Sequence, residues 1–145
     1  AYNNLGYRDR EASVRICPVS TQNPQAIARQ FNFEVRSVDA AASPYLAYAA
    51  LVFAGMQVVI DRIEPPKPTE EDLSVLTKAE LAAKGIRRLP KTLEEALEKC
   101  DYSAAVRDWF GDAFVDLYIA NKRGERAVLS ELDWTQKCDR YKDVY

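Results

Sequence analysis

Two short segments, in which apolar side chains alternate with charged ones, constrain the fold of this chain more than any other feature. The first segment, residues 12–17, carries Arg15, and the second, residues 31–36, carries Glu34 and Arg36. Side chains of a β-strand point alternately to its two faces, so each segment predicts a strand with one apolar and one charged face. If the two strands pair, two guanidinium groups and one carboxylate share a single surface of the sheet.

The same alternation is also typical of an ordinary antiparallel sheet with one face in water. On such a face, arginine opposite glutamate is a common cross-strand pair that contributes only about 0.2–1 kcal/mol. The alternation by itself therefore leaves two interpretations open, a solvated surface and a surface that carries chemistry. The segments around the two strands favour the second interpretation.

Three motifs follow one another in an order that is typical of one enzyme family. Residues 9–16 read Asp-Arg-Glu-Ala-Ser-Val-Arg-Ile, residues 33–36 read Phe-Glu-Val-Arg, and residues 39–46 read Asp-Ala-Ala-Ala-Ser-Pro-Tyr-Leu. They resemble the glutamine synthetase motifs Asn-Arg-x-Ala-x-x-Arg-Ile, Glu-x-Arg and Asp-Pro-Ala-Ala-Asn-Pro-Tyr-Leu. The resemblance continues along nearly the whole chain, through residues 63–66, 89–97, 118–123 and 133–145. It implies that residues 1–145 are the C-terminal portion of a glutamine-synthetase-like catalytic domain.

The resemblance implies part of an ATP-dependent ligase that acts on glutamate. Such an enzyme phosphorylates the side-chain carboxylate of glutamate, and ammonia or another amine then displaces the phosphate to form an amide. This reaction needs Mg²⁺ or Mn²⁺ beside the polyphosphate, and fixed cations around the transferred phosphoryl group. Arginine suits the second task because its planar guanidinium group binds phosphate and carboxylate oxygens in pairs.

Four residues of this sequence match functional positions of the family. The resemblance assigns Arg10 to the transferred phosphate and Arg15 to the phosphates of ATP. It assigns Glu34 to an active-site metal ion, and Arg36 to the substrate carboxylate or its phosphorylated form. Arg10 and Arg36 are therefore the expected catalytic and substrate-binding residues. Glu34 and Arg36 are two residues apart, so a strand would project both side chains to the same face.

Departures from the family pattern leave the amine acceptor open. Asp9 and Ser43 stand where asparagine is usual, and the connection after Cys17 looks long. The acceptor could be ammonia, a polyamine or another amine, and a nodulin/glutamine-synthetase-like fusion is a further option. Ser74 stands where some bacterial members carry the tyrosine that is adenylylated, so we expect no regulation by that route. The competing hypothesis is a non-catalytic structural or interaction module with the same fold.

Several parts of the family's active site have no counterpart in this sequence. The chain contains no histidine, and we find no match to the family's N-terminal β-grasp domain, its Asn-Gly-Ser-Gly loop or its other metal-binding carboxylates. One carboxylate cannot build a metal site. We therefore expect the isolated chain to be inactive, and the intact protein to assemble as a homo-oligomeric ring.

Charge and cysteine content exclude some classes of partner. The formal net charge is −2, from 20 basic and 22 acidic residues, so the sequence shows no electrostatic signal for nucleic acid or an anionic membrane. The chain has three cysteines that lie far apart. An odd number of dispersed cysteines favours reduced thiols, and therefore the cytoplasm, over a disulfide framework.

The expected fold class is α+β, with two strands of a mainly antiparallel sheet within about residues 10–37 and a helical region within about 43–145. Residues 40–60 carry no charge. We interpret them as part of a helix enclosed by protein that has Ser43 as its N-cap, begins at Pro44 and ends near Asp61. The spacing of threonine and glutamate predicts capping boxes at residues 77–80 and 92–95. Further helices are predicted around residues 110–129, where Gly124 is an expected interruption, and over residues 133–145.

Overall fold

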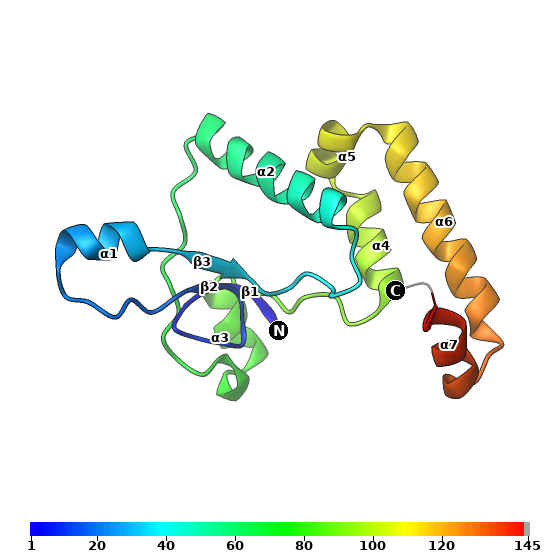
Figure 1. Ribbon diagram of the computed structural model, residues 1–145, viewed down its shortest axis with the longest axis horizontal. Coiled ribbons are helices and arrows are strands. Elements are labelled where there is room, and N and C mark those ends of the chain that lie inside the picture. Colours follow the sequence, from blue (N-terminus) through cyan, green and yellow to red (C-terminus); the bar gives the residue numbers. More distant parts are fainter. Residues whose placement is uncertain (144–145) are drawn as a thin grey trace. The chain divides into compact units, whose positions relative to one another are not determined.

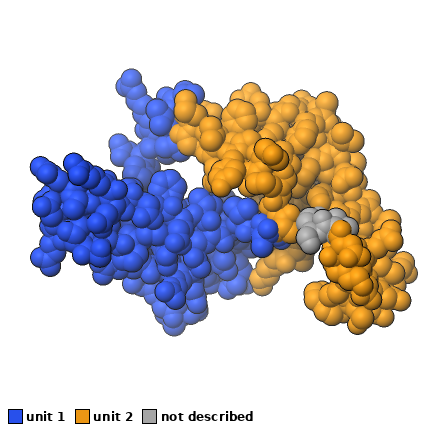
Figure 2. All heavy atoms as spheres, in the orientation of Figure 1, with its two compact units in different colours: residues 1–40, 58–89 blue, residues 41–57, 90–145 orange. Residues whose placement is uncertain are grey.

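The computed structural model describes residues 1–143, which form two compact units (Figure 2). Unit 1 contains residues 1–40 and 58–89, and unit 2 contains residues 41–57 and those from 90 onward. The fold class is α+β, as the sequence predicts, with a small sheet in unit 1 and most of the helices in unit 2.

The sheet of unit 1 has three strands in the order β1-β2-β3 (Figure 1). Their bounds are β1 (Tyr2–Tyr7), β2 (Ala12–Ile16) and β3 (Phe33–Val35). The two predicted strands, β2 and β3, pair antiparallel and place Arg15 opposite Glu34. Strand β1, which the sequence analysis did not predict, pairs with β2 in parallel, so the sheet is mixed.

A tight loop between β1 and β2 makes the parallel pairing possible. Parallel strands usually need a connection of a dozen or more residues, but residues 8–11 suffice here. Arg8 adopts a left-handed conformation with φ 59°, and its N–H donates to the carbonyl of Ile16 over 3.1 Å. A Cβ at Gly6 would lie 2.6 Å from the Cβ of Ala12. Only glycine therefore permits the close approach of β1 to the start of β2.

A short helix replaces the polar connection that the sequence predicted between the two strands. Helix α1 (Pro24–Gln30) begins with Pro24 at its first position and has Asn23 as its N-cap. The side chain of Asn23 accepts hydrogen bonds from the backbone N–H groups of Gln25 and Ala26. A proline after an asparagine N-cap is a strong start signal, and it explains why this polar segment is helical.

The remaining helices account for most of the chain after residue 43. They are α2 (Pro44–Ile60), the 3₁₀ helix η1 (Leu73–Val75), α3 (Lys78–Ala83), α4 (Leu93–Asp101), α5 (Ala104–Phe110), α6 (Asp112–Ser130) and α7 (Trp134–Tyr141). Helix α2 agrees with the predicted bounds, and α6 continues through Gly124 without a break. Residues 144–145, the end of the predicted final helix, lie outside the described residues.

Of the two predicted capping boxes, one forms completely and the other only in part. Thr77 and Glu80 form a complete capping box at α3. At α4, the side chain of Thr92 accepts from the N–H of Glu95, but the Glu95 carboxylate accepts from the N–H of Lys91 instead of from the cap residue. No helix within residues 1–143 combines the length and the apolar character needed to cross a membrane.

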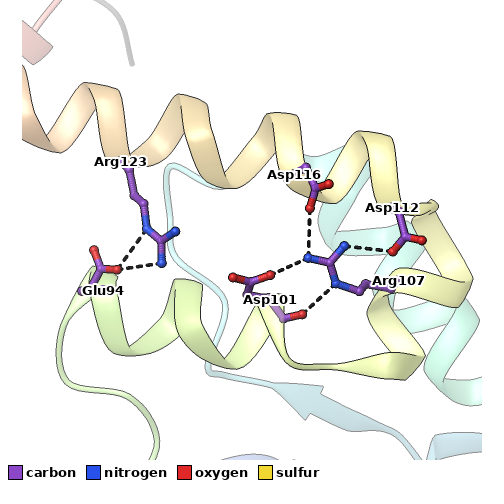
Figure 3. Close-up of polar contacts among 6 residues, drawn as sticks. All are labelled: Glu94, Asp101, Arg107, Asp112, Asp116 and Arg123. Atoms are coloured by element: carbon purple, nitrogen blue, oxygen red, sulfur yellow. Dashed lines mark hydrogen bonds and ion pairs between the residues drawn. The ribbon is translucent and has the colours of Figure 1, made fainter.

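Unit 2 has a small apolar core that ion pairs reinforce. Leu97, Val115 and Ile119 are buried where α4 packs on α6. The Arg107 side chain lies among Asp101, Asp112 and Asp116, and the Glu94 carboxylate pairs with Arg123 (Figure 3). Arg107 also donates from Nε to the carbonyl oxygen of Asp101 over 2.7 Å. These contacts tie α4, α5 and α6 together and raise the pKa of Arg107, chiefly through the hydrogen bond to Asp112.

Candidate active site

The carboxylate of Glu34 lies between two arginines on one face of the sheet. Arg15 Nη2 donates to Glu34 Oε1 over 2.8 Å, and Arg36 Nη1 donates to Glu34 Oε2 over 2.9 Å. The three side chains that the sequence predicted to share a surface do so. All of them belong to unit 1.

The strand register explains this arrangement. Arg15 of β2 stands opposite Glu34 of β3. Arg36 follows β3, and its backbone N–H donates to the carbonyl of Ser13 over 2.7 Å, so the ladder continues to this residue. Because alternate residues of a strand face the same way, Arg36 and Glu34 project to one side.

Arg15, Glu34 and Arg36 form a charged group, and Arg10 contacts this group through its backbone. Its carbonyl oxygen accepts a hydrogen bond from Arg36 Nε over 2.9 Å, while the residue itself is exposed in the loop between β1 and β2. The structure thus brings together Arg15, Glu34 and Arg36 by their side chains and Arg10 by its main chain.

Electrostatics keep the group charged. Hydrogen bonds from Arg36, Cys17 and Arg15 lower the pKa of Glu34. The pKa of Arg15 is raised, first by its hydrogen bond to Cys17 and further by Glu34, and burial opposes this rise. At neutral pH the group therefore holds two guanidinium cations around one carboxylate, which leaves one net positive charge. Such a surface attracts phosphate and carboxylate groups.

The donor set fits an anion better than a metal ion. Arg15 Nε is buried and has no hydrogen-bond partner within the described residues, so one N–H donor of this guanidinium is unused. Among residues 1–143, no group of three or more acidic, cysteine or histidine side chains could hold a metal. Both carboxylate oxygens of Glu34 already accept from arginines. These residues alone therefore do not form a metal site.

Cys17 is a member of this group that the sequence analysis counted only as a thiol. It is buried, with 9% of its surface exposed, and its Sγ accepts from Arg15 Nη2 over 3.8 Å. The signal that could have found it is its position two residues after Arg15, which places both side chains on the same face of an extended segment.

Comparisons with known proteins give a consistent result. A family model described as the catalytic domain of glutamine synthetase matches residues 1–141. A glutamine synthetase of Aquifex aeolicus is 36% identical over 140 residues, which are 94% of this chain and 28% of that protein. The gamma-glutamylpolyamine synthetase GlnA3 of Streptomyces coelicolor is 35% identical over 128 residues, which are 88% of this chain and 27% of that protein.

A solved structure has the same fold over the whole chain. The crystal structure of a glutamine synthase homolog superposes with a TM-score of 0.76 and 32% sequence identity, covering 100% of this chain and 30% of the other. The present chain thus spans little more than a quarter of the length of the curated relatives it matches.

Proposed function

This chain belongs to the glutamine synthetase family, and we propose that it supplies part of the active site of an ATP-dependent ligase that joins an amine to glutamate. On this proposal, residues 1–145 correspond to the C-terminal portion of the catalytic domain. The observation that carries the proposal is the Glu34 carboxylate held between Arg15 and Arg36. An ordinary cross-strand ion pair would need only one arginine opposite Glu34. The second arginine gives this surface a net positive charge, which attracts anions.

Each member of the group has a proposed role. Arg15 binds the phosphates of ATP through guanidinium donors that Glu34 and Cys17 do not occupy. Arg36 binds the carboxylate of glutamate or its phosphorylated form. Arg10, whose guanidinium group lies in an exposed loop, binds the transferred phosphoryl group. Fixed cations at these places stabilise the negative charge of the transition state.

A divalent metal ion, Mg²⁺ or Mn²⁺, would supply further charge neutralisation beside the phosphates. Glu34 is proposed to contribute one ligand to it, through a lone pair that the hydrogen bonds from Arg15 and Arg36 leave free. The described residues do not form a metal site by themselves, and we propose that the remaining ligands come from residues outside them. The relatives' greater length supports this proposal.

The proposal also covers the amine acceptor, the cellular compartment and the assembly of the intact protein. The chain is similar to glutamine synthetases and to a gamma-glutamylpolyamine synthetase, at 36% identity to one of the former and 35% to the latter, so ammonia and polyamines are both proposed acceptors. The three cysteines are free, which supports a reducing compartment such as the cytoplasm. We also propose a homo-oligomeric ring for the intact protein, and we propose no nucleic acid or membrane as a partner.

A chimera tests the proposed function directly. Residues 1–141 of this chain replace the matching segment of the Aquifex aeolicus enzyme, and the formation of ADP and amide is measured with glutamate and either ammonium or a polyamine. We expect activity with at least one acceptor, and a loss of about tenfold or more in turnover for Arg36→Ala, because a charge-stabilising donor is removed.

Arg29→Ala is the matched control, since Arg29 is an exposed arginine of α1 in the same unit. It should leave turnover unchanged. A chimera that assembles like the Aquifex enzyme but is inactive would favour the alternative, a structural module without chemistry. Equal turnover of the Arg36→Ala and Arg29→Ala chimeras would refute the proposed role of Arg36.

A further inference from the structure

Cys17 occupies a fixed place at the end of the charged group. It follows β2 directly, and its backbone N–H donates to the carbonyl of Asn32 over 3.1 Å, so its main chain continues the β2–β3 ladder. Its side chain is buried on the face that carries Arg15 and Glu34. A side chain so constrained can restrict the orientation of its neighbours.

The thiol contacts the Arg15 guanidinium, which also contacts Glu34. Arg15 Nη2 carries two hydrogens, and it donates to Glu34 Oε1 over 2.8 Å and to Cys17 Sγ over 3.8 Å. Glu34 and Cys17 are therefore two acceptors at one Nη2 group, and both of its N–H donors are used.

The Arg15 guanidinium depends on these two acceptors for its orientation. Only 14% of its side-chain surface is exposed, and its buried Nε finds no acceptor within the described residues. The Nη2 group is thus the end of the side chain that is held, and a single bond to Glu34 would still allow the planar head to turn. The second acceptor, Cys17 Sγ, removes that freedom. Holding a charged group in one orientation before its ligand arrives lowers the entropic cost of binding.

We propose that Cys17 is a positioning residue, whose thiol orients the Arg15 guanidinium so that its free edge is ready for a phosphate group. This proposal rests on the proposed function for the identity of the phosphate, which is that of ATP. The orientation itself is a property of this chain. It can therefore be tested without any ligand.

The first test uses ¹⁵N-labelled chain and the NMR signals of the Arg15 guanidinium, identified by their loss in Arg15→Lys. Hydrogen bonds at Nη2 slow rotation about the Cζ–Nη2 bond and give separate proton signals. We expect these signals to merge in Cys17→Val, which fills similar space without a polar atom. They should persist in Cys17→Ser, whose hydroxyl can also accept and donate.

Packing damage is separated from loss of orientation by two further measurements. Urea unfolding of each variant shows whether the chain is folded, and Cys17→Ala serves if Cys17→Val does not fold. Separate Nη2 signals that persist in a folded Val or Ala variant would overturn the proposal. Merged signals in Cys17→Ser as well as in Cys17→Val would also overturn it, because the serine should restore the contacts.

The second test measures KM for ATP and kcat in the chimera. We expect Cys17→Val to raise KM for ATP by about fivefold to tenfold with little change in kcat, and Cys17→Ser to restore it. A raised KM in Arg15→Ala with an unchanged KM in Cys17→Val would overturn the role of Cys17. If neither variant changes KM while the NMR effect is present, the orientation stands and the proposed role of Arg15 falls.

Discussion

At the scale of single residues, the Glu34 carboxylate compensates the positive charges of Arg15 and Arg36 on one face of the sheet. Its carboxylate accepts from Arg15 and Arg36, and the two guanidinium groups would repel each other without it. The same carboxylate limits how strongly this surface attracts anions. Glu34 therefore raises the stability of the sheet and lowers the affinity of this surface for phosphate.

Replacing Glu34 by glutamine should shift that balance in a measurable direction. We expect Glu34→Gln to lower the urea midpoint of the 145-residue chain, because the largely buried Arg15 loses its ionic partner. The matched control is Glu71→Gln, which removes an exposed pair with Lys84 in the same unit. Exposed pairs contribute little to stability. Equal shifts in the two variants would contradict the special position of Glu34.

The side chains of this site were predictable only where a strand carries them. Arg15, Glu34 and Arg36 could be placed on one face because alternation and antiparallel pairing follow from local pattern. The position of Arg10 could not, because a loop conformation that includes a left-handed residue at Arg8 leaves no periodic signal. The contact with Cys17 could have been inferred from its spacing, but an apolar environment for a cysteine is common enough to hide it.

At the scale of helices and strands, the residue at which a helix begins is predicted better by a local N-cap and proline than by the composition of the segment. The start of α2 was predicted from Ser43-Pro44, and the same reasoning applied to Asn23-Pro24 would have identified α1. Strand β1 was missed because its sequence Tyr-Asn-Asn-Leu-Gly-Tyr holds residues with low strand propensity. Its pairing depends on tertiary contacts, including the hydrogen bond from Tyr7 N–H to the Thr69 carbonyl over 3.0 Å. Contacts so distant along the chain leave no local trace in the sequence.

Replacing Gly124 and Gly85 by alanine should change the stability of the chain in opposite directions. Gly124 lies inside α6, where an added Cβ meets nothing within 4 Å, so Gly124→Ala should stabilise the chain by about 0.5–1 kcal/mol. Gly85 ends α3 with φ +70°, and the N–H of Ile86 donates to the Leu81 carbonyl over 2.9 Å, as in a Schellman motif. Gly85→Ala should therefore destabilise the chain by about 1 kcal/mol.

Denaturant unfolding of both variants checks this pair of predictions. A helix that is interrupted at Gly124, as the sequence suggested, would gain nothing from alanine there. A gain in stability for Gly124→Ala would thus confirm independently that α6 is continuous. A gain for Gly85→Ala would contradict the left-handed cap.

At the scale of the whole molecule, helix α2 exposes apolar side chains to solvent. It is apolar on every side, a pattern typical of helices enclosed by protein. Yet Tyr45 and Val52 are 85% and 63% exposed, although Phe53 of α2 makes aromatic contacts with Trp109 and Phe110. Apolar surface of this extent is seldom left in water by a stable monomer.

We therefore expect the 145-residue chain to self-associate as its concentration rises, because pairing of exposed apolar surface removes it from water. Sedimentation equilibrium over a range of concentrations measures this. The double variant Tyr45→Lys and Val52→Lys, seven positions apart on one side of α2, should weaken association at least about tenfold. Tyr102→Lys is the control, since Tyr102 is 87% exposed but lies outside α2. Equal weakening by the control would assign association to general surface hydrophobicity, and a wild-type monomer at all concentrations would mean that α2 tolerates water.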